Sequence, residues 1–325
     1  MNLLQKLNRL KIWDDVAKDT YKNPKVVDNQ VDPDPSTDEW HPPMEEDEKI
    51  NTGNEIQKVQ AELKKSNLNE NNLKLMQKGL EEYQCIFGNT ELGSVTDYSV
   101  GITMKPDYKE WHSNTRAGNS EFEEREMNKQ IMNLWKKGFI EESDSHVSSN
   151  LLLVKKAGSS KLRLCTNLVK CNDQCMQVDE KLPTLEQGLS KLGKKKIFSV
   201  IDLRQGFWQI PVEEDSRKFL AFKTPSGLFQ WKVMPFGLKT APAYFTKSIR
   251  RMLSAKYGDS SLHERLGPGA LETLAADPYA FAYMDDIVIY SDDEESHTQH
   301  VLDIMRRIKE FGLKISAEKT HLFKK

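Results

Sequence analysis

"YAFAYMDDIVIYSDDEE", residues 279–295, places two adjacent carboxylates, Asp285 and Asp286, between two runs of apolar and aromatic residues. The two runs predict a β-hairpin whose turn carries both aspartates. Two like charges about 4 Å apart repel by roughly 4 kcal/mol at an effective dielectric of about 20. We therefore expect a half-buried strand to carry such a pair only at an exposed turn or where the pair faces a cation.

A second apolar strand, within "KKKIFSVIDLRQGFWQIPV" at residues 194–212, also delivers an aspartate. Phe198, Val200 and Asp202 share one face of this strand because side chains alternate with a period of two. Carboxylate oxygens suit Mg²⁺, which is usually bound by one or two carboxylates plus substrate phosphates. Two such ions a few Å apart can clamp the attacking and leaving oxygens of a phosphoryl transfer. If the fold brings Asp202 to the paired aspartates, the three acids predict a magnesium site for this chemistry.

A second hairpin is predicted by "NLLLVKKAGSSKLRLCT", residues 150–166, with basic side chains at or near its tip. An arginine such as Arg163 can bind a phosphate group bidentately, so this tip is a candidate triphosphate site. Two plainer interpretations remain open at this point. Aspartate favours turns without any metal, and a basic hairpin tip is more often a solvated surface.

The composition of the chain sets limits on its class. Of 325 residues, 38% are hydrophobic and 30% are charged, which leaves room for two or three domains. No apolar run approaches the ~20 residues that a membrane-spanning helix needs, so we expect no membrane partner. The four cysteines form no CxxC pair, which favours reduced thiols in an intracellular, cytoplasmic protein.

Charge is distributed unevenly along the chain. Residues 1–100 contain 12 Lys and Arg against 19 Asp and Glu, whereas the remainder contains 35 against 30. Within residues 151–200 there are ten basic and four acidic residues. This electropositive region favours a polyanionic partner such as nucleic acid, although the net charge of the whole chain is −2.

Helix and strand patterns alternate from about residue 120 onward without a strict strand–helix–strand repeat, which favours an α+β fold. Residues 1–95 are predicted to be an acidic, partly disordered extension or linker, with one helix at about 54–86. The first of the later elements is a helix from the capping box of Ser120 and Glu123 to Gly138, with an apolar stripe of Met127, Ile131, Leu134 and Trp135. The other expected elements are the hairpin 150–166, a helix within 184–193, a strand ending near Asp202, a strand at 227–233, a helix at 238–253, the hairpin 279–295 and a helix ending at Gly312.

Three motifs resemble a known family. "FSVIDLRQGFWQI" (198–210), "VMPFGLKTAPAYF" (233–245) and "AYMDDIVIYS" (282–291) closely resemble successive motifs in the reverse transcriptases of gypsy-type long-terminal-repeat retrotransposons and retroviruses. "LVKKAGSSKLRLCTNLVKCN" before them and "FGLKISAEKTHLF" after them resemble the flanking segments. The resemblance covers about residues 95–325. It implies a right-hand polymerase fold at 96–325, with fingers at about 120–196, an antiparallel palm sheet with packed helices at about 197–325, and a thumb that is largely missing.

The resemblance also implies roles for individual acids. Asp202 and Asp285 match the two metal-bridging carboxylates, and Asp286 matches the third acid. Lys319 matches a lysine proposed to protonate the leaving pyrophosphate, although a solvated lysine is an equal alternative. Two further residues of the hairpin would border the primer terminus: Tyr283 and Met284.

Other matched positions imply a nucleotide site. Phe207 falls on an aromatic gate that excludes a ribose 2′-OH, although an ordinary core phenylalanine is the alternative. Arg163 falls on the fingers arginine that contacts the triphosphate. The remaining implied nucleotide-binding residues are Lys155 or Lys156, near the fingers lysine, and Phe236 and Gly237, which would pack against the nucleotide and the template base.

The function that the resemblance implies is RNA-directed DNA synthesis. The enzyme would be a nucleotidyltransferase that adds dNTPs to a primer 3′-OH on an RNA or DNA template, using two Mg²⁺ ions or, alternatively, Mn²⁺. It would act in the cytoplasm or in a virus-like particle. A catalytically inactive or truncated remnant that binds nucleic acid is the alternative. An RNA-synthesising polymerase is disfavoured by the bulky ring of Phe207.

The chain departs from the family pattern at several places. Asn167, Leu168 and Val169 stand where the family usually shows Asp-Tyr-Arg, and Asn150 replaces a customary proline. About 15–20 extra residues, near 254–278, precede the metal hairpin when judged against usual short connections. We therefore expect a fingers–palm piece of a polyprotein whose thumb and ribonuclease H modules come from the rest of that polyprotein, with weak primer grip and low processivity.

Overall fold

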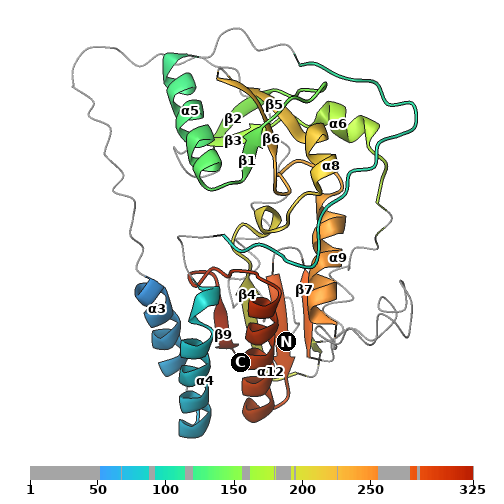
Figure 1. Cartoon of the computed structure of the whole chain (residues 1–325). Coiled ribbons are helices and arrows are strands. Elements are labelled where there is room, and N and C mark those ends of the chain that lie inside the picture. The colour runs from blue at the N-terminus through green and yellow to red at the C-terminus, as the bar shows by residue number, and fades with distance from the viewer. Residues whose placement is uncertain are drawn as a thin grey trace, which may run out of the picture. The chain divides into compact units, whose positions relative to one another are not determined.

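The computed structural model describes residues 52–66, 68–87, 92–113, 120–155, 162–178, 180, 192–193, 195–224, 226–254, 279–283 and 286–324. Residues from Thr52 to Lys325 belong to one compact unit, in which helices and short sheets alternate along the chain (Figure 1). All pairs of named strands are antiparallel, so the predicted α+β class is confirmed. None of the described helices is long and apolar enough to cross a membrane.

The elements have the following bounds. The α-helices are α3 (Thr52–Lys64), α4 (Glu70–Glu82), α5 (Glu121–Lys136), α6 (Val169–Gln174), α8 (Glu214–Arg217), α9 (Ala241–Leu253) and α12 (Glu294–Glu310). The short 3₁₀ helices are η1 (Gln84–Ile86), η2 (Gly206–Gln209) and η3 (Lys218–Leu220). The strands are β1 (Ile140–Glu142), β2 (Leu151–Lys155), β3 (Leu162–Thr166), β4 (Ile197–Asp202), β5 (Ala221–Thr224), β6 (Gly227–Trp231), β7 (Ala280–Tyr283), β8 (Asp286–Ser291) and β9 (His321–Lys324).

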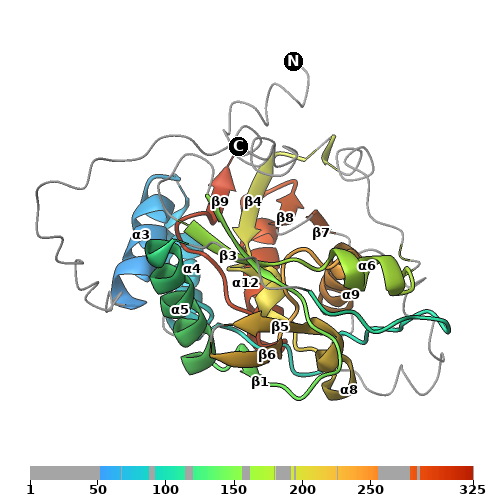
Figure 2. The same ribbon diagram turned by 90° about the horizontal axis from the view of Figure 1, so that it is seen from above.

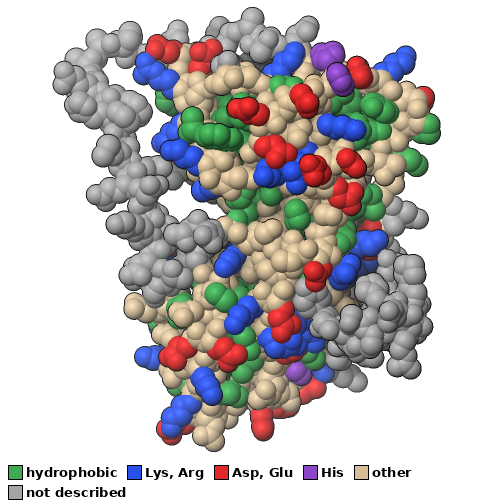
Figure 3. All heavy atoms as spheres, in the orientation of Figure 1, with side chains coloured by type: hydrophobic (Ala, Val, Ile, Leu, Met, Phe, Trp, Pro, Cys, Tyr) green, Lys and Arg blue, Asp and Glu red, His purple; other side chains and the backbone are tan. Residues whose placement is uncertain are grey.

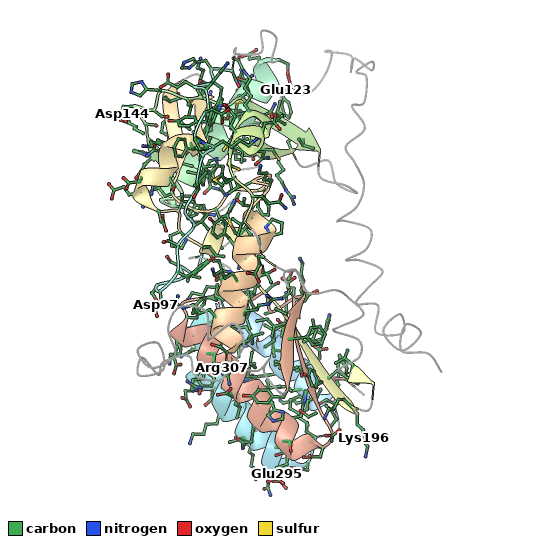
Figure 4. The ribbon with its side chains drawn as sticks, turned by 90° about the vertical axis from the view of Figure 1, so that its right-hand side faces the viewer. Asp97, Glu123, Asp144, Lys196, Glu295 and Arg307 are labelled. Atoms are coloured by element: carbon green, nitrogen blue, oxygen red, sulfur yellow. The ribbon has the colours of Figure 1, made fainter. Side chains whose placement is uncertain are left out.

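The elements gather in two groups, which Figure 1 shows one above the other. The upper group contains α5, α6, α8, the two-stranded sheet β2–β3 and the three-stranded sheet β1–β6–β5. The lower group contains α3, α4, α9, α12 and the four-stranded sheet β7–β8–β4–β9. Strands β5 and β6 fall in the predicted palm range, but β6 pairs with β1 of the predicted fingers and β5 pairs with β6, so the chain crosses between the groups more than once. Figure 4 shows Glu123 and Asp144 at one end of the unit and Lys196 and Glu295 at the other.

The four-stranded sheet has one face packed against helices. Ile201, Ile287 and Ile289 lie on this face and have no exposed surface, because β4 and β8 present alternate residues to α12. In Figures 1 and 2, α12 lies between α4 and α9. The buried Arg307 joins α12 to α9, because its Nη1 donates to Leu253 O at 2.8 Å. The sheet thus rests on a continuous layer of helices.

The helix predicted from Ser120 is confirmed as α5. Ser120 Oγ accepts from Glu123 N, and the Glu123 carboxylate accepts from Ser120 N, which completes the capping box. Met127, Ile131 and Leu134 are buried as expected. Trp135 was expected on the same stripe, but its exposed fraction is 51%. Its position, one residue after Leu134, turns it by about 100° around the helix and away from the core.

The single helix predicted at about 54–86 is instead two helices, α3 and α4. Asn69 begins the second helix by accepting at its side chain from Asn72 N at 2.8 Å, and side-chain capping of this kind favours a new helix start. Both helices pack on other elements of the lower group, α3 on β9 and α4 on α12. Glu62 of α3 pairs with His321 at the β9 edge, while Asn72 donates to Glu294 of α12.

The predicted boundaries after residues 95 and 196 stay predictions. Both hairpins, the strand ending at Asp202 and the helices at 238–253 and before Gly312 are confirmed as elements. Almost all of the expected helix within 184–193 and of the expected loop at 254–278, and the whole hairpin tip at 156–161, lie outside the described residues. On the face seen in Figure 3, acidic and basic side chains are interspersed over both groups.

Candidate functional site

The two described acids of the predicted trio lie directly opposite each other in the four-stranded sheet. Asp202 is the last residue of β4 and pairs with Asp286, the first residue of β8. Directly opposite residues in antiparallel strands have Cβ atoms about 4.5–5.5 Å apart. Asp286 was predicted in the hairpin turn, but it is a strand residue that also pairs with Tyr283 of β7. The turn residues Met284 and Asp285 lie outside the described residues, and so does the side chain of Tyr283.

The Asp202 carboxylate is largely buried beside one cation. Its side chain is 15% exposed, and its Oδ2 lies 3.6 Å from Lys319 Nζ. Burial raises the pKa of Asp202, while the charge of Lys319 and its hydrogen bond act in the opposite direction. The Lys319 side chain is 72% exposed, so it reaches the acid from the solvent side. Lys319 therefore lies beside Asp202, and its implied catalytic role stays a prediction.

A buried polar network holds β4 and β8 on the face of the sheet opposite to the two acids. His297 of α12 is bonded through Nε2 to Ser199 Oγ at 2.7 Å and through Nδ1 to Ser291 Oγ at 2.9 Å. His300 Nδ1 also bonds Ser291 Oγ, at 2.8 Å. Burial lowers the pKa of His297 to about 3, with the charge of His300 as a further cause. This network joins β4 and β8 to α12 and holds the strands that end in the two acids.

Aromatic rings form a second part of the site. Phe207 lies on η2, five positions after Asp202, and its ring centroid is 5.3 Å from that of Phe245 and 5.6 Å from that of Phe236. Phe236 is 37% exposed. Gln205, just before η2, has a left-handed backbone with φ 46°. At this turn the backbone leaves the direction of β4, and the half-buried Phe207 ring packs against Phe245 of α9.

The predicted basic residues lie on the β2–β3 hairpin. Arg163 of β3 is exposed, and its guanidinium lies 6.0 Å from the centre of the Phe236 ring. Lys155 is the last residue of β2 and pairs with Leu162, but its side chain is outside the described part of the structure, as is all of Lys156. The fold thus brings Arg163 to the aromatic cluster.

Asn172 contributes to the site but was not predicted from the sequence. It lies on α6, donates from Nδ2 to Gly237 O at 2.7 Å and accepts at Oδ1 from Lys239 N at 2.8 Å. Gly237 has φ +89°, a conformation that favours glycine, and it directly follows Phe236. The helix α6 that carries Asn172 was not expected from the sequence, so no local pattern indicated this residue. Its side chain holds the turn that presents the Phe236 ring.

The donor chemistry of the facing acids fits a divalent cation. Two carboxylates on opposed strands offer hard oxygen ligands in a partly buried setting, and Mg²⁺ prefers such ligands. Within the described ranges, no group of three or more His, Cys, Asp or Glu side chains could hold a metal by itself. The third predicted ligand, Asp285, lies outside those ranges.

Facing carboxylates at the end of an antiparallel sheet, with a basic hairpin in the second group of elements, are the arrangement of a right-hand polymerase domain with fingers and palm. The chain belongs to the family described as reverse transcriptase (RNA-dependent DNA polymerase), whose model matches residues 154–325, more than half of the chain. Members of this family generally use divalent metal ions.

Two similar proteins are polyproteins, of which this chain matches only a part. The chain is 33% identical over 199 residues to the "Enzymatic polyprotein" of Figwort mosaic virus (strain DxS), covering 60% of this chain and 27% of the relative. It is 29% identical over 231 residues to the "Retrovirus-related Pol polyprotein from transposon 412" of Drosophila melanogaster, covering 70% of this chain and 17% of the relative. The chain therefore spans about a quarter or less of these two proteins.

Solved structures share the fold. A foamy viral protease-reverse transcriptase in complex with an RNA/DNA hybrid has a TM-score of 0.65 at 20% identity, covering 82% of this chain and 33% of the other. The foamy viral protease-reverse transcriptase dRH in complex with double-stranded DNA has a TM-score of 0.62, also at 20% identity, and the match covers 82% of this chain and 44% of the other. These similarities confirm the predicted fingers and palm fold.

Proposed function

We propose that this chain is the fingers–palm part of an RNA-directed DNA polymerase from the Pol polyprotein of a gypsy-type long-terminal-repeat retrotransposon. The observation that carries the proposal is the facing pair of Asp202 and Asp286 at the ends of β4 and β8, in a chain of the reverse transcriptase family. The similarity to the transposon 412 polyprotein supports a retrotransposon origin. The similarity to the Figwort mosaic virus polyprotein favours a viral origin as the alternative.

In this proposal Asp202, Asp285 and Asp286 hold the divalent ions. Two Mg²⁺ ions, or Mn²⁺, would stabilise the charge that develops on the attacking and leaving oxygens. The β4 and β8 strands keep Asp202 and Asp286 opposite each other, so little reorganisation is needed when the substrate arrives. The exposed ammonium of Lys319 lies 3.6 Å from Asp202 Oδ2 and would donate a proton to the leaving pyrophosphate.

The fingers and the aromatic cluster bind the incoming nucleotide. Arg163 would bind the triphosphate, together with Lys155 or Lys156 at the hairpin tip, because guanidinium and ammonium groups bind phosphate strongly. The Phe207 ring would exclude a ribose 2′-OH, and so select dNTPs. Two groups of residues complete the proposed assignment: Phe236 and Gly237 against the nucleotide and template base, and Tyr283 and Met284 at the primer terminus.

The proposed partners are an RNA or DNA template with its primer, and dNTPs. Phosphate contacts dominate such binding, so affinity should fall steeply as salt concentration rises. The thumb and ribonuclease H functions would come from the rest of the polyprotein, and the site of action would be the cytoplasm or a virus-like particle.

The test is primer extension on poly(rA)/oligo(dT) with Mg²⁺ or Mn²⁺. The wild-type chain should incorporate dTTP, and Asp285→Asn should abolish incorporation because it removes a proposed metal ligand. Asp215→Asn, an exposed acid on α8, is the control and should leave incorporation unchanged. Wild-type protein without any incorporation would favour the inactive remnant, and incorporation by Asp285→Asn would refute the metal assignment.

The sugar gate has a separate test. Phe207→Ala should allow incorporation of rNTPs at a rate closer to that of dNTPs, because the ring that meets the 2′-OH is gone. Phe229→Ala is the matched control, since Phe229 is also half-buried but packs against Phe222 of β5. Unchanged discrimination in Phe207→Ala would mean that this ring only fills the core.

A further inference from the structure

Gln209 is a fully buried amide close to the candidate site. It ends η2 and has no exposed surface. Its Nε2 donates to the backbone oxygens of Arg204 (2.6 Å) and Lys314 (3.0 Å), and its Oε1 accepts from Lys314 N at 2.7 Å. All three bonds require the same orientation of the amide, because two partners are acceptors and the third is a donor. The side chain therefore bridges segments that are 105 residues apart.

The bridged segments form a short antiparallel seam, which we define by two backbone hydrogen bonds. Arg204 N donates to Lys314 O at 3.1 Å, and Ser316 N donates to Asp202 O at 2.9 Å. The first segment begins with Asp202 itself. The second leads, three residues after Ser316, to Lys319. The seam thus joins the backbone of the acid to the segment that carries the cation beside it.

A third segment closes over Gln209 and leaves no space around it. Val95 N donates to Gln209 O at 2.9 Å. A Cβ on Gly93 would overlap Gln209 Oε1 and the backbone oxygen of Gly312. Gly312 has φ +79°, and a Cβ there would overlap Ser94 O. Because backbone from two segments packs so closely on this amide, a shorter or longer side chain cannot reproduce its bonds.

Removing the amide would take hydrogen bonds from two partly buried backbone groups, Arg204 O and Lys314 N. A partly buried backbone group that loses a hydrogen bond inside the protein must be hydrated instead, and leaving it unpaired is costly. The seam would have to open to let water reach them. Such a movement would displace Asp202 and Lys319 relative to each other.

We infer that Gln209 is a positioning residue, whose amide holds the seam closed and so sets the distance between the Asp202 carboxylate and the Lys319 ammonium. It reaches neither group directly and acts through the backbone. Its effect on DNA synthesis rests on the proposed function, whereas its effect on the seam does not. The competing interpretation is a purely structural amide, whose loss weakens the whole fold without any particular effect on the acid and the lysine.

The experiment uses Gln209→Met in the full chain, a change that keeps the length of the side chain and removes all three hydrogen bonds. Asn72→Leu is the matched control, because Asn72 is also a buried amide, 6% exposed, and bonds Glu294 far from the seam. If Gln209→Met does not fold, Gln209→Glu replaces it. This variant keeps the acceptor for Lys314 N and loses the donor.

The first measurement is amide hydrogen exchange of Arg204 and Ser316, the two donors of the seam. Gln209→Met should speed their exchange at least about tenfold more than its effect on global stability explains, since the opening is local. Asn72→Leu should change these amides only as global stability changes. Equal, purely global changes in both variants would overturn the inference.

The second measurement is single-turnover dNTP incorporation in a double-mutant cycle with Lys319→Met. Gln209→Met should lower the rate by about 10- to 100-fold, because a displacement of about 1 Å in a catalytic group can cost that much. Lys319→Met should cost much less in the Gln209→Met background than in wild type, since the lysine is already displaced. Asn72→Leu and Lys319→Met should combine additively.

The two measurements separate the possible failures. If the wild-type chain synthesises no DNA, the proposed function fails, and hydrogen exchange alone decides whether Gln209 closes the seam. If the wild-type chain is active but Gln209→Met and Lys319→Met combine additively, the positioning role is refuted while the polymerase function stands.

Discussion

The hairpins β2–β3 and β7–β8 share a sequence pattern but differ in how they are held. Each joins two apolar strands through a charged tip or turn. The β2–β3 hairpin is a two-stranded sheet of its own, and Val154 and Arg163 on it are exposed. The β7–β8 hairpin is part of a four-stranded sheet that packs on α12, with Ile287 and Ile289 fully buried.

This difference separates the two charged parts of the candidate site. An isolated two-stranded hairpin has only marginal stability in water. Gln130 of α5 supports β2–β3 by donating to Leu162 O and accepting from Leu164 N. The acids of the palm sheet cannot shift without disturbing a packed core. We therefore expect the basic side chains of β2–β3 to move with a bound nucleotide, whereas the two acids stay in place. Preorganised carboxylates of this kind favour phosphoryl transfer, because they need not rearrange during the reaction.

The largest expected effect comes from the acid at the end of β4. Asp202→Asn should lower single-turnover dNTP incorporation by about 10³-fold, because the loss of a proposed metal ligand would remove several kcal/mol of transition-state stabilisation. The melting temperature should stay the same or rise, since Asp202 faces the like charge of Asp286. A variant that lost activity only because it had unfolded would not support the comparison.

The burial difference itself can be measured by truncating one residue in each hairpin. Ile289→Ala should lower the free energy of unfolding by about 3 kcal/mol, because it leaves a cavity in the core. Val154→Ala should lower it by less than about 1 kcal/mol, since Val154 is 41% exposed. Urea unfolding checks both values, and equal losses would mean that the fingers hairpin is as firmly packed as the palm hairpin.

The network behind β8 should make the palm sensitive to acid. The folded state keeps His297 neutral, with a pKa of about 3 against an ordinary value of 6.5, so its unfolded state binds more protons below pH 6.5. Stability should fall as pH drops through 6.5, by about 2 kcal/mol from this group at pH 5. The charge of His300 also lowers the pKa of His297, whereas the charge of Asp293 raises it. Urea unfolding as a function of pH should show this loss.

Two variants isolate the contribution of that histidine. His297→Gln should flatten the dependence of unfolding free energy on pH below 6.5, although it lowers stability at neutral pH by disturbing the network. His112→Gln, at an exposed position in the upper group, should leave the dependence unchanged. An unaltered slope in His297→Gln would assign the acid sensitivity to other groups.

The smallest of these effects is expected on the exposed hairpin. Arg163→Met should raise the Kd for dNTP about tenfold, because one charge-assisted contact to the triphosphate is lost. Arg163→Lys should recover only part of the affinity, since an ammonium cannot bind bidentately. Pre-steady-state incorporation measures both Kd and rate, and an unchanged Kd in Arg163→Met would place the triphosphate elsewhere.

Local patterns in the sequence were sufficient for most of the elements. The capping box at Ser120, the two hairpins and the helix before Gly312 each follow from residues close to one another in the chain. The prediction was wrong where one helix was expected at about 54–86, because the cap at Asn69 was not recognised. It was also wrong for Trp135, whose exposure depends on which side of α5 meets the core.

The sequence by itself determined the family, the fold class and the residue types of the site, because motifs and two- or 3.6-residue periods are local properties. Only the tertiary structure decided that Asp286 stands in a strand opposite Asp202, and that Lys319 lies beside it. The same holds for the amides of Gln209 and Asn172, whose partners are 105 and 65 residues away. Strand register and buried hydrogen bonds are set by packing between distant segments, which no local pattern encodes.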